Sequence, residues 1–176
     1  IIITNSGISK SRIKRFYQRD SEVIEPPVEI DRIPLSTKPG SFWLTGGRLV
    51  PYKRFDLVVR AFAKLNLPLK IFGNGPERKK LEKIAGSKTE FLGHIPEQKK
   101  IELFQNAIAF LHPQLEDFGI TAVEAMAAGR PIIAFGQGGA AETVLDGVTG
   151  QFFEVQCWED IGNAAIRFDP GRYDPP

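Results

Sequence analysis

The chain has 176 residues, the size of one ordinary domain, which is long enough to bury about 70% of its unfolded surface. The formal net charge of +2 gives no ground for a nucleic-acid-binding protein. The single cysteine, Cys157, excludes a disulfide framework, and no apolar run approaches the ~20 residues that cross a bilayer.

The first 28 residues predict a short strand, a basic helix and an extended linker. Ile1 to Thr4 are strand-like, and Ser9 is a candidate N-cap for the helix that follows. Pro26 and Pro27 then favour extended backbone, as in a linker between domains. We therefore expect residues 1–28 to be the remnant of a preceding domain with its linker.

From residue 41 onward, short β-rich runs alternate with amphipathic helical runs. The expected strands are 41–45, 69–73, 89–93, 107–112, 131–135 and 150–154. The expected helices are 55–65, 76–85, 97–106, 119–128, 139–145 and 158–168. This alternation predicts an α/β fold, a doubly wound parallel six-stranded sheet with helices on both faces. A closed eight-stranded barrel would need roughly 250 residues.

Sheets of this kind bind ligands beyond the carboxyl ends of their strands, so the loops there are the places to look. The first is TGGRLVPYK (45–53), in which a glycine pair lets backbone approach a ligand. Arg48 and Lys53 bring two cations to the same strand end, which suits a diphosphate. The alternative is a loop with two solvated charges.

Two further loops are rich in glycine. FGNGPE (72–77) places glycines around Asn74 before a helix start, where free amides attract anions; the alternative is a plain tight turn. It lacks the third glycine of a dinucleotide fingerprint. FGQGGAAE (135–142) has glycines that could contact a sugar or phosphate, and Glu142 is expected to stabilise the first turn of its own helix.

The fourth loop, HPQLEDFG (112–119), leads directly into an apolar helix. The free amides of Ile120 and Thr121 form a ready anion site, and Glu116 can reach into the same cleft. Glu124 lies within the apolar helix, where a buried carboxylate needs a partner. That partner is either a pair of ligand hydroxyls or a cation, Arg130 or a neighbouring lysine.

Other polar residues give weaker signals. His94 and His112 lack metal-ligand spacing, so no metal site is expected and both are interpreted as structural hydrogen bonders. Cys157 has no nearby base that would make it a nucleophile. Phe16 and Tyr17 are interleaved with basic residues, but a solvated helix face explains them more simply than nucleic acid.

The loops, taken together and in order, resemble those of retaining glycosyltransferases of the GT-B fold, family 4 (glycosyl transferases group 1). E-D-F-G-I-T-A-V-E (116–124) resembles the family's E-x7-E signature, and G-G-R-L-V-P-Y-K resembles its G-R-L-x-x-x-K loop. G-N-G-P, E-A-M-A-A-G-R-P-I-I-A and G-G-A-A-E-T-V-L-D-G-V-T-G resemble three more of its motifs. The resemblance covers residues 41 to about 155 and is closest to lipopolysaccharide-type mannosyltransferases.

The resemblance implies a role for each matching residue. Arg48 and Lys53 would hold the donor diphosphate and stabilise the leaving group, and Glu116 would contact the donor sugar. These three are the implied catalytic residues, and Glu124 would bind the ribose hydroxyls. The other implied donor-binding residues are Gly47, Gly73, Asn74, Gly75, His94, Ile95, Phe118, Gly119, Ile120 and Thr121. Such enzymes need no obligatory metal or cofactor.

The resemblance also implies what surrounds this chain. Residues 29–176 would be the C-terminal nucleotide-sugar-binding domain, without the family's final helix, and the N-terminal Rossmann-like domain would be missing. The full enzyme would transfer a sugar, with mannose from GDP-mannose favoured, to a glycan or lipid-linked acceptor. It would be cytoplasmic, with peripheral association at the inner face of a membrane left open. The fragment alone would bind nucleotide weakly and not turn over.

Two other functions stay open at this point. A non-catalytic nucleotide-binding or regulatory module could keep the same fold, since doubly wound sheets host many functions. An NAD-dependent oxidoreductase domain is disfavoured by the missing dinucleotide fingerprint after the first regular strand.

Overall fold

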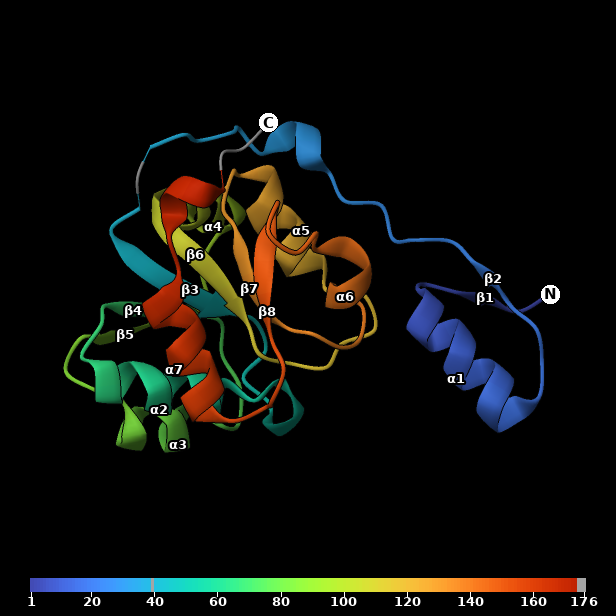
Figure 1. Cartoon of the computed structure of the whole chain (residues 1–176), viewed down its shortest axis with the longest axis horizontal. Helices are drawn as coiled ribbons and strands as arrows, with labels where there is room; N and C mark the ends of the chain where they lie inside the picture. Colours follow the sequence, from blue (N-terminus) through green and yellow to red (C-terminus); the bar gives the residue numbers. More distant parts are fainter. Residues whose placement is uncertain (39, 174–176) are drawn as a thin grey trace.

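The computed structural model describes residues 1–38 and 40–173, and its main body is a six-stranded sheet. The strands are β3 (Phe42–Gly46), β4 (Leu69–Phe72), β5 (Thr89–Gly93), β6 (Ala107–His112), β7 (Ile132–Phe135) and β8 (Gly150–Phe153). They lie in the order β5-β4-β3-β6-β7-β8, and every neighbouring pair is parallel (Figure 1). Each strand predicted from residue 41 onward is present to within one residue at each end, which confirms the doubly wound parallel sheet.

Helices cover both faces of this sheet. One face packs against α2 (Phe55–Leu65), α3 (Arg78–Ile84) and α7 (Trp158–Arg167). The other packs against α4 (Glu97–Asn106), α5 (Ile120–Ala127) and α6 (Ala140–Thr143). Three short 3₁₀ turns complete the described elements: η1 (Ile30–Arg32), η2 (Pro51–Lys53) and η3 (Pro170–Arg172). The end of the predicted domain, residues 174–176, lies outside the described residues.

Burial of both faces of the strands explains why their sequences are continuous apolar runs. In β7, Ile133 and Phe135 belong to the core beneath α2 and α7, whereas Ile132 and Ala134 belong to the core beneath α4 and α5. All four side chains are buried. A strand covered on both faces has no polar face, so it loses the alternation of a half-exposed strand.

The order of the strands creates one switch point. From β3 the chain first builds outward through β4 and β5, and later returns to place β6 on the other side of β3. The loop after β3 and the loop after β6 therefore leave the sheet side by side at its carboxyl edge. Ligands of open α/β sheets bind at such a point.

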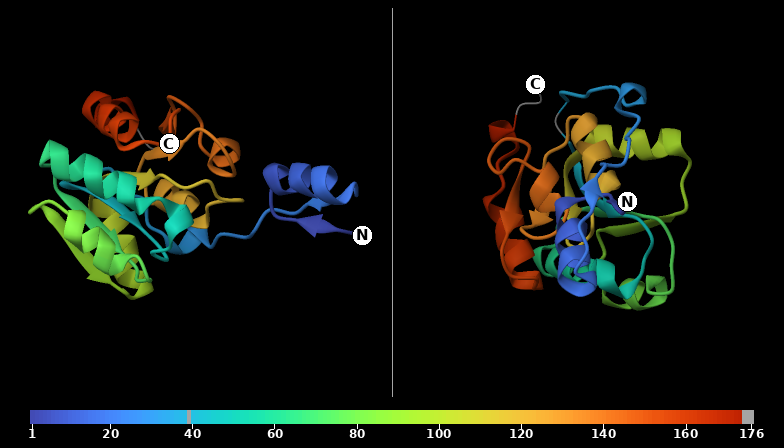
Figure 2. Two further views of the ribbon diagram at one scale, coloured as in Figure 1. Left: turned by 90° about the horizontal axis from the view of Figure 1, so that it is seen from below. Right: turned by 90° about the vertical axis from the view of Figure 1, so that its right-hand side faces the viewer.

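A small N-terminal unit lies to one side of this body. It contains β1 (Ile3–Thr4), α1 (Gly7–Tyr17) and β2 (Glu22–Val23), with β1 and β2 paired in parallel (Figures 1 and 2). The strand β2 was not predicted. The N-cap of α1 is Ser6, whose Oγ accepts the N–H of Ser9 at 3.2 Å, so the prediction that Ser9 caps this helix is wrong.

Polar contacts join α1 to the main body. The carboxylate of Glu142 accepts the N–H groups of Gly7 and Ile8 at 2.8 and 2.7 Å, and Arg12 pairs with Asp117. Glu142 therefore caps α1, a helix more than a hundred residues away in the sequence. It lies in the first turn of its own helix, as predicted, but makes no capping hydrogen bond there. The free N–H groups at a helix start attract any suitably placed carboxylate, whatever its position in the chain.

Candidate functional site

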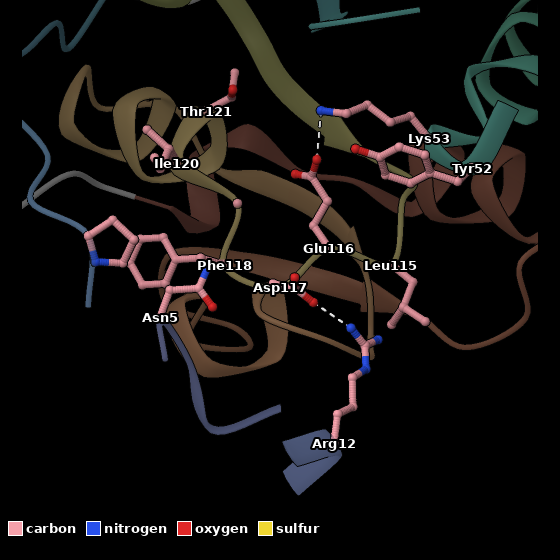
Figure 3. A pocket seen from close by; sticks show the side chains of 12 residues that line it. Asn5, Arg12, Tyr52, Lys53, Leu115, Glu116, Asp117, Phe118, Ile120 and Thr121 are labelled. Atoms are coloured by element: carbon pink, nitrogen blue, oxygen red, sulfur yellow. Dashed lines mark hydrogen bonds and ion pairs between the residues drawn. The ribbon is translucent and has the colours of Figure 1, made fainter. Parts of the chain in front are cut away.

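A cavity of about 530 Å³ opens at the switch point of the sheet. Side chains from the loops after β3 and β6, from the start of α5 and from the N-terminal unit line it (Figure 3). The lining residues are Asn5, Arg12, Pro26, Tyr52, Lys53, Leu115, Glu116, Asp117, Phe118, Gly119, Ile120 and Thr121. Six of the residues proposed for the site from the sequence thus meet around one space, namely Lys53, Glu116, Phe118, Gly119, Ile120 and Thr121.

An ion pair between Lys53 and Glu116 crosses this cavity. Lys53 Nζ lies 2.6 Å from Glu116 Oε1, and the two side chains are only 13% and 18% exposed (Figure 3). Burial alone would raise the pKa of Glu116, but the hydrogen bond from Lys53, the nearby His112 and the Gln114 amide lower it below its usual range. Glu116 is therefore a carboxylate at neutral pH, available to accept hydrogen bonds.

Two buried side chains lie beneath Glu116. Gln114 Nε2 is 3.1 Å from His112 Nδ1 and 3.3 Å from Glu116 Oε2. His112 is fully buried at the end of β6, and this burial lowers its pKa to about 4, so the imidazole is neutral at neutral pH. Sequence reasoning assigned no role to Gln114, although its position two residues after the strand end was a usable signal.

The start of α5 forms one wall of the cavity. The helix begins at Ile120 with no side-chain cap, so its first amides remain available to an acceptor in the cavity. The N-cap residue is Gly119, with φ of +93°, and a Cβ there would lie 3.2 Å from the His112 ring. Glycine at this position thus serves both the left-handed backbone and the close approach of the imidazole.

Glu124 lies beside a second cavity of about 290 Å³, which shares Ile120 with the first. Its two carboxylate oxygens lie 3.0 and 2.9 Å from Lys100 Nζ, and the same ammonium lies 3.0 Å from Glu97. Burial would lower the pKa of Lys100, but these carboxylates raise it. Of the two cations considered from the sequence, a lysine, Lys100, is therefore the partner of Glu124.

Arg130, the other cation considered for Glu124, is held elsewhere. Its guanidinium donates to the backbone carbonyls of Ser36, Lys38 and Ala107. It is buried and fastens the segment before β3 to the sheet, so the alternative that paired it with Glu124 is wrong.

The glycine-rich loops pack against the site loops. Gly73, with φ of +97°, lies against the carbonyl of Gly47, and Leu49 N donates to Asn74 O at 2.9 Å. Gly139 N donates to Glu116 O at 2.7 Å, which holds the Glu116 loop in place. For Gly73 and Gly75, the close backbone approach to Gly47 and Leu49 accounts for glycine without a ligand.

The remaining predicted residues lie near the site but not in the wall of the larger cavity. Arg48 and His94 are exposed, and Ile95 is half-buried. A Cβ at Gly47 would lie 3.4 Å from Lys53 Nζ, so this glycine adjoins the ammonium. Within residues 1–38 and 40–173, no three His, Cys, Asp or Glu side chains are grouped to hold a metal ion. Over the same ranges, no helix has the length and apolar character to cross a membrane.

Comparison with known proteins agrees with the motifs. Residues 29–168 match the family model described as Glycosyl transferases group 1. The chain is 34% identical over 140 residues to the D-inositol 3-phosphate glycosyltransferase of Mycobacterium leprae, which covers 71% of this chain and 33% of that protein. It is 48% identical over 75 residues to the alpha-1,3/1,6-mannosyltransferase ALG2 of Dictyostelium discoideum, covering 42% of this chain and 18% of that protein.

A solved structure shares the fold. The crystal structure of Anabaena HepE in complex with UDP and glucose superposes with a TM-score of 0.83 at 23% identity, covering 98% of this chain and 54% of that one. The chain spans about a third or less of the two curated relatives described above. On the family match and the shared Rossmann-like half of a GT-B fold, the chain belongs to the glycosyl transferases group 1 family.

Proposed function

We propose that this chain is the donor-binding part of a retaining glycosyltransferase, which transfers a sugar from a nucleoside-diphosphate sugar to a glycan or lipid-linked acceptor. The observation that carries the proposal is the mostly buried Lys53–Glu116 pair, which lies in the wall of a cavity of about 530 Å³ beside the start of α5. A cation and free helix amides suit a diphosphate, and an ionised carboxylate suits sugar hydroxyls, so one space offers partners for both parts of a sugar diphosphate.

The diphosphate is assigned to the start of α5 and to Lys53. Negative charge grows on the leaving diphosphate during transfer, and an ammonium in an enclosed site stabilises that charge more strongly than water does. Arg48 follows β3 on the same loop, and its exposed side chain is free to turn toward the same phosphates. The ionised Glu116 is then the acceptor for hydroxyls of the donor sugar.

The nucleoside is assigned to the second cavity. Glu124 lies in its wall and shares the Lys100 ammonium with Glu97. Ribose hydroxyls are donors, so the Glu124 carboxylate can accept hydrogen bonds from them. Gly73 to Gly75, His94 and Ile95 are proposed to flank the base.

For the sugar, we propose mannose carried by GDP. The support is the 75-residue stretch that is 48% identical to a mannosyltransferase. No metal is proposed to take part, so nucleotide affinity should be the same with and without EDTA.

Residues 1–28 are proposed to belong to the N-terminal domain of the full enzyme. Asn5 and Arg12 of this segment line the larger cavity, which supports a donor site at the border of two domains.

The replacement Lys53→Ala is expected to weaken nucleoside diphosphate binding by roughly tenfold to a hundredfold, because a charge-assisted hydrogen bond contributes about 1.5–3 kcal/mol. Calorimetry with GDP, UDP and ADP measures this and ranks the three bases. The matched control is Lys99→Ala, since Lys99 pairs with Glu102 on the exposed side of α4. Absence of binding to all three nucleotides, or equal losses in the two variants, would favour a structural module over the proposed function.

A second replacement tests the ribose assignment. Glu124→Gln is expected to weaken nucleotide binding by about 1–3 kcal/mol, because the amide offers the hydroxyls one acceptor oxygen in place of two charged ones. Lys100→Met is the control, since it breaks the same ion pair but keeps the carboxylate. An unchanged affinity in Glu124→Gln, together with equal losses of stability in both variants, would identify Glu124 as a structural acid.

A further inference from the structure

His112 has a buried ring nitrogen without a hydrogen-bond partner. The side chain is fully buried, and Nε2 has no partner within the described chain. Glu116 Oε2 lies 3.7 Å from it, which is beyond hydrogen-bonding distance. A buried polar atom without a partner is costly, so its presence directly beneath the candidate site needs an explanation.

The position of Gln114 determines which ring nitrogen carries the proton. Glu116 is ionised, so its Oε2 requires a donor, and the Gln114 amide nitrogen at 3.3 Å supplies one. The same amide nitrogen lies 3.1 Å from His112 Nδ1, which must then be an acceptor without a proton. A neutral imidazole with a bare Nδ1 carries its proton on Nε2, the nitrogen that faces Glu116.

The opposite tautomer of His112, with its proton on Nδ1, would place donor against donor and acceptor against acceptor. A proton on Nδ1 would face the Gln114 amide protons, and the Nε2 lone pair would face the carboxylate. Rotating the Gln114 amide would relieve the first conflict but would bring its oxygen to the Glu116 carboxylate. Only the Nε2–H form agrees with all three groups.

The Nε2–H group of His112 becomes important when Lys53 no longer pairs with Glu116. Lys53 Nζ lies 2.6 Å from Glu116 Oε1, whereas in the proposed function the same ammonium binds a diphosphate. Glu116 would then keep its charge in an enclosed site without its cation, which is unfavourable unless other donors face it. Gln114 and His112 are the donors already oriented toward it from β6 and the loop that follows.

We propose that His112 is a positioning residue for Glu116: as the Nε2–H tautomer fixed by Gln114, it donates toward the carboxylate and holds it in place when Lys53 turns to a phosphate. This proposal rests on the proposed function for the identity of the group that attracts Lys53. The contacts among His112, Gln114 and Glu116 do not depend on it. The competing explanation is that His112 only fills space under Gly119.

The tautomer can be measured in this chain without any ligand. Nitrogen-15 NMR of the histidine rings at pH 7 should show His112 protonated on Nε2 and bare on Nδ1. The chain has two histidines, and His94→Ala assigns the signals. A proton on Nδ1, or a mixture of tautomers, would overturn the proposal whether or not the chain binds nucleotides.

The role of His112 in supporting Glu116 is tested in variants in which methionine replaces Lys53 and removes its charge. Carbon-13 NMR follows the titration of the Glu116 carboxyl in two double variants, K53M/H112Q and K53M/H112F. Glutamine can keep an N–H near the position of Nε2, whereas phenylalanine fills the space without a donor. The pKa of Glu116 is expected to be higher in K53M/H112F, with roughly tenfold higher proton affinity, because a hydrogen bond to the charged form is lost.

Equal titration of Glu116 in the two double variants would mean that His112 acts by packing alone. This result is separate from the calorimetry above: loss of nucleotide binding in all proteins would refute the proposed function, while the tautomer and the titration still decide whether His112 supports Glu116. Thermal unfolding of both double variants checks that each is folded before its titration is compared.

Discussion

Replacing Gly73 by alanine is expected to lower the free energy of unfolding by about 4 kcal/mol. Gly73 has a φ of +97°, which side chains rarely adopt, and this strain costs about 1–3 kcal/mol. The new Cβ would also collide with the backbone carbonyl of Gly47, and such overpacking costs typically 1–3 kcal/mol. Backbone cannot rotate aside as a flexible side chain can, so the two losses should add.

Gly147→Ala is the matched control for this prediction. Gly147 also has a positive φ, +74°, but nothing lies within 4 Å of the place where its Cβ would be. Its replacement should cost only about 1–2 kcal/mol, the penalty of the backbone conformation alone. Urea unfolding measures both variants. Equal losses would show that the approach of the two loops is not tight, and Gly73 would again be a candidate for ligand contact only.

Acidification from pH 7 to pH 4 is expected to lower the free energy of unfolding by about 3 kcal/mol through His112. Its pKa is about 4 in the folded chain, against 6.5 for an unfolded histidine. Between these values the unfolded chain binds a proton that the folded chain does not, so stability rises with pH across this window and falls on acidification. The charged groups that face the ring are Glu116, which favours its protonation, and Lys53, which opposes it.

The variant His112→Gln should remove this part of the pH dependence, since glutamine does not titrate. Urea unfolding at several pH values from 4 to 7 measures the effect. Comparison of the variant with the unaltered chain isolates His112, because the lowered pKa of Glu116, which acts mainly near and below its ordinary value of 4.5, contributes in both. His94→Ala, at an exposed position, should keep the slope of the unaltered chain. A slope that survives in His112→Gln would mean that another group titrates.

The sequence alone determined the order of the helices and strands in the main body, and their bounds to within two residues. Continuous apolar runs such as AIAFLH at 107–112 and amphipathic runs such as 55–65 are local patterns, and the structure places β6 and α2 at those bounds. The loops after the strands were expected to carry the site, since parallel strands end at one edge of a sheet. That is why Lys53 and Glu116 were both predicted for the site.

The tertiary structure decided which side chains pair there. Lys53 with Glu116, Lys100 with Glu124, and Glu142 with the start of α1 each join residues far apart in the chain. For Glu124 the sequence offered Arg130 or a neighbouring lysine, and the actual partner depends on α4 lying beside α5. The distance between Lys53 and Glu116 depends on β6 lying beside β3. The residue types and the ends of the strands follow from local sequence patterns. The partner of each acid and the proposed tautomer of His112 follow only from the packing of the whole domain.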